Sequence, residues 1–73
     1  MSKADKMFEE LGYEKISEER KTTYKNGAKT FDFFCGSIKR ILVYETDTEY
    51  AGLITPKELQ AINEKCREMG WLE

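Results

Sequence analysis

The chain has 73 residues, of which 40% are hydrophobic and 36% are charged, and its formal net charge is −2 at pH 7. A chain of this length forms one domain that buries roughly 60% of its unfolded surface, so it needs a well-packed core or an associated second chain. Its acidic balance argues against general binding to nucleic acids or membrane surfaces. It has no histidine, which removes the most common general base and the most common metal ligand.

A short amphipathic helix is predicted at the start of the chain, over residues 2–11. Its apolar residues recur at helical spacing and form one stripe: Ala4, Met7, Phe8 and Leu11. Ser2 is placed to cap the first turn, and Gly12 is placed to end the helix with Tyr13 folded back on the stripe. A helix this short is not stable alone in water, so we expect it to dock on a sheet.

The next segment, residues 13–25, is polar, and we predict a first strand near its end. Ile16 is its only aliphatic residue, and strand-forming Thr and Tyr residues follow. Asn26-Gly27 is a strong hairpin signal because both residue types tolerate positive φ. We expect a strand over about residues 20–25, at the edge of the sheet, where its Lys and Arg side chains discourage pairing with other chains.

Residues 30–46 are the most apolar part of the chain and predict a central β-hairpin around Gly36-Ser37. Aromatic and β-branched residues on both sides of a Gly-centred break are typical of paired strands. A loop of two residues or of three decides which cross-strand pairs meet. One face would carry Phe31, Phe33, Ile41 and Val43, and the other Asp32, Phe34, Ile38, Arg40, Leu42 and Tyr44. Both faces are therefore more apolar than a sheet covered on one side requires.

An acidic loop is predicted over residues 45–52. Glu45, Asp47 and Glu49 form a small cluster there, and its functional interpretation is a divalent-cation site. The spacing of a calcium loop is not present, so the alternative is an ordinary solvated loop.

A second helix is predicted up to Gly70, and it has the clearest local signature in the sequence. Thr55 is the N-cap, Pro56 follows at the first helical position and Glu58 completes a capping box. Ile54 and Leu59 are placed to form a hydrophobic staple across this start. The apolar stripe consists of Leu59, Ile62, Cys66 and Met69, with Ala61 beside it and Trp71 packing back after Gly70.

These elements predict a single α+β domain with the order α-β-β-β-α. Three strands would form an antiparallel meander with two helices packed on one face. The core would join one sheet face to the two helical stripes: Phe31, Phe33, Ile41 and Val43 against Met7, Phe8, Leu11, Leu59, Ile62, Cys66 and Met69. The other face of the sheet would stay partly bare.

The residues do not support an enzyme, and we expect no cofactor and no metal. Cys35 and Cys66 are far apart in the sequence, so we interpret them as free thiols, the second of them buried in the core. Neither has a predicted base beside it, although Cys35 lies near Lys39 and Arg40 at the hairpin tip. No apolar run approaches 18 residues and no signal-peptide pattern begins the chain, so we expect a cytoplasmic protein with no membrane partner.

The bare sheet face is the candidate partner-binding site. Its predicted contact residues combine apolar, aromatic and basic side chains, as interface hot spots do: Phe34, Ile38, Lys39, Arg40, Leu42 and Tyr44. Three interpretations stay open: the face closes a homodimer, it is covered by residues 13–19, or it binds another protein. The alternative function is binding of a nucleotide or single-stranded nucleic acid by Phe34, Lys39, Arg40, Arg20 and Lys21, which the net acidity disfavours.

Two stretches also carry a resemblance. Residues 7–13 (MFEELGY) and residues 59–66 (LQAINEKC), closing on Gly70-Trp71, resemble those of small uncharacterised phage and prophage proteins of Gram-positive bacteria. The apolar turn at Cys35-Gly36-Ser37 departs from the charged turn expected there. The resemblance implies a non-enzymatic accessory protein in the bacterial cytoplasm. Such a protein would bind and occlude a host protein, for instance one of a host defence system, or would sequester a nucleotide.

Overall fold

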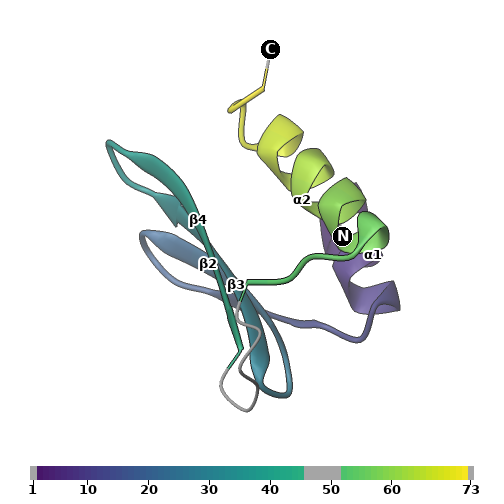
Figure 1. Cartoon of the computed structure of the whole chain (residues 1–73). Helices are drawn as coiled ribbons and strands as arrows, with labels where there is room; N and C mark the ends of the chain where they lie inside the picture. Colours follow the sequence, from purple (N-terminus) through teal and green to yellow (C-terminus); the bar gives the residue numbers. More distant parts are fainter. Residues whose placement is uncertain (1, 46–51, 73) are drawn as a thin grey trace.

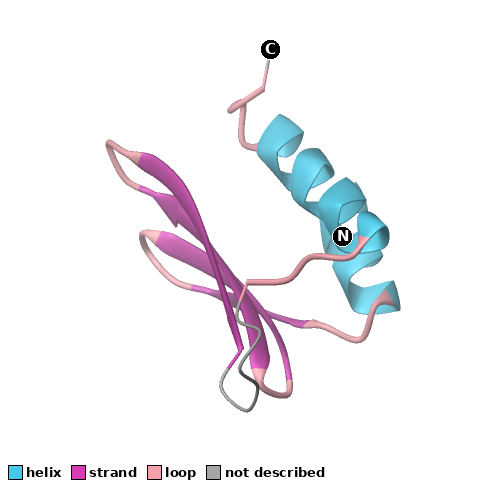
Figure 2. Ribbon diagram, in the orientation of Figure 1, coloured by secondary structure: helices cyan, strands magenta, loops and turns pink. Residues whose placement is uncertain are grey.

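The computed structural model describes residues 2–45 and 52–72 and shows an α+β domain built from two helices and four strands. The elements are α1 (Lys3–Glu10), β1 (Glu14–Ser17), β2 (Lys21–Asn26), β3 (Lys29–Cys35), β4 (Lys39–Glu45) and α2 (Pro56–Glu68). The strands form one antiparallel sheet in the order β1-β2-β3-β4. Both helices lie on the same side of this sheet (Figures 1 and 2). The predicted class and meander are confirmed, whereas the prediction of three strands is wrong.

The additional strand is β1, an edge strand that pairs with β2 so that Ile16 lies opposite Thr23. All residues of β1 are exposed. Lys15 turns toward the helices, where its Nζ lies 2.7 Å from Oδ2 of Asp5, and Ile16 turns away from them. An ion pair thus takes the place of an apolar residue on the side facing the helices, and the strand shows no apolar alternation in the sequence.

The position of β1 corrects one prediction and argues against one of the open interpretations. The strand expected over residues 20–25 spans Lys21–Asn26 and lies inside the sheet, between β1 and β3, rather than at its edge. Residues 14–17 do not cover the bare sheet face, because they extend the sheet sideways.

Both helices begin and end as their cap residues predict. Ser2 Oγ accepts a hydrogen bond from Asp5 N at 3.0 Å, and Tyr13 N donates to Phe8 O at 2.9 Å after Gly12, whose φ is 90°. In α2 the capping box between Thr55 and Glu58 is complete. Its end repeats the first pattern, since Gly70 has a φ of 74° and Trp71 N donates to Cys66 O at 2.9 Å.

The two hairpin turns fix the register of the sheet. Asn26 pairs with Lys29, so the first turn consists of Gly27 and Ala28, one residue later than the predicted Asn26-Gly27. Gly27 adopts a φ of 58°, which glycine reaches without strain. The second turn has three residues, 36–38, because Cys35 pairs with Lys39. This register places Phe31 opposite Val43 and Phe33 opposite Ile41, one of the two face assignments the sequence allowed.

The core is a cluster of aromatic rings between the sheet and the helices. The ring of Phe8 stacks on that of Tyr24, with centroids 4.0 Å apart and planes at 12°. It meets Phe33 edge-on at 6.1 Å and Tyr13 edge-on at 5.7 Å. The buried cluster consists of Phe8, Tyr13, Tyr24, Phe31, Phe33, Ala61, Ile62 and Cys66, with Met7, Leu11, Val43, Met69 and Trp71 partly buried around it.

Two residues that were predicted in the core are exposed. Leu59 is 50% exposed because Glu58 occupies the sheet-facing position of the first turn of α2, and the next residue is turned by about 100°. Its exposure, and the 44% exposure of Ile54, give no support to a buried staple. Ile41 is 37% exposed because it lies toward the tip of the β3–β4 hairpin, which splays away from α2 (Figure 1).

Candidate protein-binding face

The sheet has one side that no helix of the described chain covers, and we call it the outer face. Alternate residues of each strand point to it, and the register aligns them in three cross-strand rows. The rows are Lys21, Phe34 and Arg40; Ile16, Thr23, Asp32 and Leu42; and Glu14, Lys25, Thr30 and Tyr44. The helices lie on the opposite side (Figure 2).

The outer face has a polar floor, with both apolar and charged side chains around it. Asp32 is only 3% exposed, and its Oδ1 accepts a hydrogen bond from Thr23 Oγ1 at 2.6 Å. Around this floor Leu42 is 48% exposed, Ile16 43% and Tyr44 36%. The sequence assigned Asp32 to this face, and the structure buries it in the middle of the face. A partner would therefore meet separate apolar side chains around a buried carboxylate.

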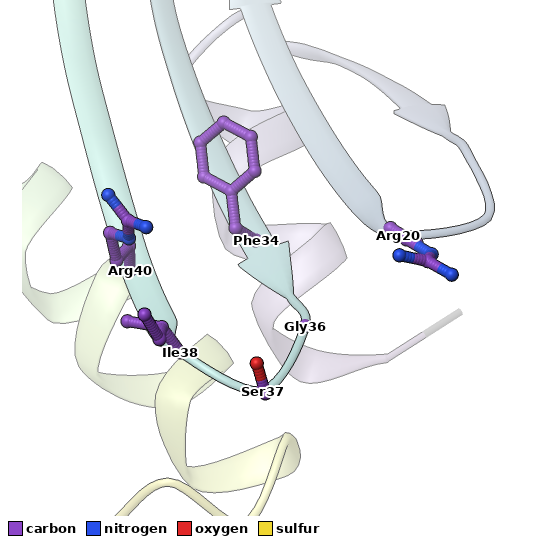
Figure 3. Close-up of a pocket in the computed structure, with 6 residues that line it drawn as sticks. All are labelled: Arg20, Phe34, Gly36, Ser37, Ile38 and Arg40. Carbon is purple, nitrogen blue, oxygen red and sulfur yellow. The ribbon is translucent and has the colours of Figure 1, made fainter.

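An open depression lies at the end of the outer face nearest the β3–β4 turn. Its volume is about 410 Å³, and its lining consists of Arg20, Phe34, Gly36, Ser37, Ile38 and Arg40. Figure 3 shows the ring of Phe34 between the two arginines, with Ser37 and Ile38 on the turn beside it. The backbone of this end is tied to the start of β2, because Cys35 N donates to Arg20 O at 2.8 Å.

The structure brings together most of the predicted contact residues. Phe34, Arg40, Leu42 and Tyr44 lie on the outer face. Ile38 lies beside it, in the turn rather than on a strand, and is 61% exposed. Lys39 is exposed, but it pairs with Cys35 and alternates with its neighbour in β4, so its side chain leaves the strand on the helix side.

Sequence reasoning missed Ile16 as part of this face. It reaches the outer face only because β1 joins the sheet, and this short polar segment has no apolar alternation that would predict a strand. Arg20 was considered only for the nucleic-acid alternative, and the depression gives it a place beside Phe34.

A buried titratable cluster around Glu58 lies on the helix side and is structural. Glu58 accepts hydrogen bonds from Tyr13 Oη at 2.6 Å, Lys29 Nζ at 2.7 Å and Thr55 N at 2.9 Å. Burial by itself raises the pKa of Glu58, but the bonds from Lys29 and Tyr13 outweigh it and leave this pKa below its ordinary value. Burial and the Glu58 carboxylate raise the pKa of Tyr13. These contacts join α2 to β3 and to the end of α1.

The two cysteines and the described part of the acidic cluster lie at separate places in the fold. Cys35 is exposed, and Cys66 is buried, as predicted, with the pKa of its thiol raised by burial. Glu45 ends β4, with its Oε1 at 4.0 Å from Lys29 Nζ, whereas Asp47 and Glu49 lie outside the described residues. Within residues 2–45 and 52–72, no group of three or more Cys, Asp or Glu side chains is placed to hold a metal ion.

Comparisons with models of protein families, with curated proteins and with solved structures gave no match. In the part of the chain that the structure describes, neither helix has the length and apolar composition that a membrane crossing requires.

Proposed function

We propose that this protein is a small binding module that docks on a partner protein through the outer face and occludes the surface it covers. The single observation that carries the proposal is the exposure of Leu42, Ile16 and Tyr44 on a sheet face that lies opposite both helices. Scattered exposed apolar residues are common, but here they surround one polar floor on one face, with an arginine-flanked aromatic ring at its end. In line with the resemblance to small phage proteins, we place the partner in a bacterial host.

Binding of single-stranded nucleic acid has less support. The two aromatic residues of the outer face are Phe34, opposite Arg40, and Tyr44, opposite Thr30. Arg40 and Tyr44 are four positions apart on β4, so the rings lie about 13 Å from one another at 3.3–3.4 Å per residue. The aliphatic Leu42 lies between them. Neighbouring bases stack on neighbouring aromatic side chains, so this spacing suits a protein surface better than a run of bases.

Affinity capture with point variants tests the proposal. Tyr44→Asp and Leu42→Gln change the outer face, and Leu59→Gln, on the helix side with a similar exposure, is the matched control. Leu42→Gln is preferable to a carboxylate substitution because Leu42 lies opposite the buried Asp32. We expect a host protein to be retained by the wild type and by Leu59→Gln and lost with the other two. Equal retention by all four proteins would contradict the proposal.

Sedimentation of the purified chain separates a hetero-partner from a second copy. A monomer that Tyr44→Asp leaves unchanged agrees with an outer face that is free for another protein. A dimer that Tyr44→Asp dissociates would show that the face binds its own copy, and the occlusion of a host protein would then be wrong.

A further inference from the structure

The depression at the end of the outer face has an unusual combination of lining groups. Phe34 and Ile38 supply an apolar wall, and Arg40 on β4 and Arg20 on the β1–β2 connection line the depression from its two sides (Figure 3). Phe34 is half-buried and lines the depression, so part of its side chain is available for contact. Gly36 adds no side chain, which leaves the space beside the ring open.

The charge of this end is opposite to that of the whole chain. In the described part of the protein, neither Arg20 nor Arg40 takes part in an ion pair. Lys21 lies beside them, with its Nζ 6.0 Å from the centroid of the Phe34 ring and 3.8 Å from Glu18 Oε2. Arg20, Lys21 and Arg40 therefore outnumber Glu18 and Glu19 at this end of the outer face, in a chain whose net charge is −2. Such a separation of charge favours and orients an anionic partner surface.

We propose that the depression binds an acidic segment of the partner protein, in which carboxylates flank one apolar or aromatic side chain. The apolar side chain would pack on Phe34 and Ile38, and the carboxylates would pair with Arg20 and Arg40. Guanidinium groups form charge-assisted, bidentate hydrogen bonds with carboxylates, and their planar shape suits positions beside an aromatic ring. This inference rests on the proposed function and adds the chemistry of the partner.

Titration of the isotope-labelled full chain with short peptides, followed by amide NMR shifts, tests this chemistry. The probe is the peptide Asp-Glu-Phe-Glu-Asp, and the comparison peptides replace its carboxylates by Lys or its Phe by Ala. We expect the acidic aromatic peptide to shift the amides of Phe34, Ser37, Ile38 and Arg40 at millimolar concentration. The Lys peptide should leave them in place, and the Ala peptide should bind more weakly.

Variants of the arginines sharpen the test. Arg20→Ala and Arg40→Ala should each weaken binding of the acidic peptide roughly fivefold, the effect of about 1 kcal/mol expected of an exposed charge pair. Lys57→Ala removes an exposed cation from α2 and is the control that should change nothing. Arg40→Glu should shift the preference toward the Lys peptide. A urea midpoint equal to that of the wild type would show that this variant keeps the fold.

Several outcomes would overturn the inference. No shift with the acidic peptide, or equal shifts with the Lys peptide, would remove the anionic preference. Stronger shifts with single-stranded oligothymidylate than with the peptide would assign the depression to nucleic acid.

Capture with the same variants distinguishes a failure of the proposed function from a failure of the acidic-segment inference. If the captured partner is lost with Tyr44→Asp but retained by Arg20→Ala and Arg40→Ala, the outer face binds a protein and only the acidic-segment inference is wrong. If capture is insensitive to Tyr44→Asp as well, the proposed function itself is wrong.

Discussion

The helix side and the outer face of the sheet bury different kinds of residues. On the helix side, Tyr24 and Phe31 pair across β2 and β3 and are fully buried. At adjacent positions of the same strands, Thr23 and Asp32 pair on the outer face and are buried as well, but they are polar and joined by a hydrogen bond. Because the side chains of a strand alternate, residues that build the core and residues that are free for contact can follow one another in the same strand. The comparison shows that burial alone does not identify the core: the aromatic side carries the fold, and the other side is available for contact.

The largest expected effect is on the helix side of the sheet. Phe31→Ala removes a fully buried ring from the centre of the aromatic cluster and should cost about 3–5 kcal/mol, a large part of the stability of a domain this small. Phe31→Leu, at about 1–2 kcal/mol, keeps the chain folded enough to measure. Urea unfolding provides both values. A loss below 1 kcal/mol for Phe31→Ala would contradict the division between the two faces.

The buried carboxylate on the helix side should rank next. Glu58→Ala removes half of the capping box and leaves Lys29 and Tyr13 without their acceptor, so we expect a loss of about 3 kcal/mol. Glu9→Ala on the exposed surface of α1 is the matched control and should stay within about 0.5 kcal/mol. Similar urea midpoints for the two variants would show that the network does not hold α2 in place.

The same network makes stability depend on pH. Burial raises the pKa of both Glu58 and Asp5, but hydrogen bonds and nearby lysines outweigh it, so both lie below their ordinary values of 4.5 and 3.8. A lowered pKa in the folded state adds stability that is present above the ordinary value and is lost as the pH falls below it. We therefore expect the urea midpoint to be flat near neutral pH and to fall below about pH 4.5. Glu58→Gln should make this fall shallower, and an unchanged slope would argue against the contribution of Glu58.

Substitutions in the polar floor of the outer face should have a smaller effect on stability, and a second substitution should reverse most of it. Asp32→Ala leaves the Thr23 hydroxyl buried without its acceptor, which should cost about 1–2 kcal/mol. Replacing both partners, as in Thr23→Val with Asp32→Leu, should recover most of this loss because no buried polar group then stays unpaired. If the double variant loses as much stability as Thr23→Val and Asp32→Leu lose in sum, the two residues act independently.

The parts of the fold that the sequence predicted are those with local signals. The helix caps at Ser2 and Thr55 and the glycine stops at Gly12 and Gly70 are side-chain and backbone preferences within a few residues, and all four are confirmed. The central hairpin followed from its apolar content, although its register needed the length of the turn. β1 was missed because its place in the sheet depends on pairing with β2 and on the Lys15–Asp5 ion pair, and neither is visible in a four-residue polar segment.

The part of the candidate site that the sequence predicted is the part that follows from strand alternation. Phe34, Arg40, Leu42 and Tyr44 share a face because alternate residues of paired strands do so in a known register. The depression at its end was not predictable, since Arg20 joins its lining only because the β1–β2 connection lies beside the end of β3, where Cys35 N donates to Arg20 O.

The smallest predicted effects test the register of the outer face itself. Leu42→Gln changes an exposed side chain and should alter the free energy of unfolding by no more than about 0.5 kcal/mol. Leu42→Asp should cost about 1 kcal/mol more, because Leu42 lies directly opposite Asp32 and like charges at such positions repel. Asp32→Asn should remove that difference between the two variants, which urea unfolding of the four combinations measures. If Leu42→Asp were as stable as Leu42→Gln, the two residues would not be cross-strand neighbours, and the rows that define the outer face would have to be redrawn.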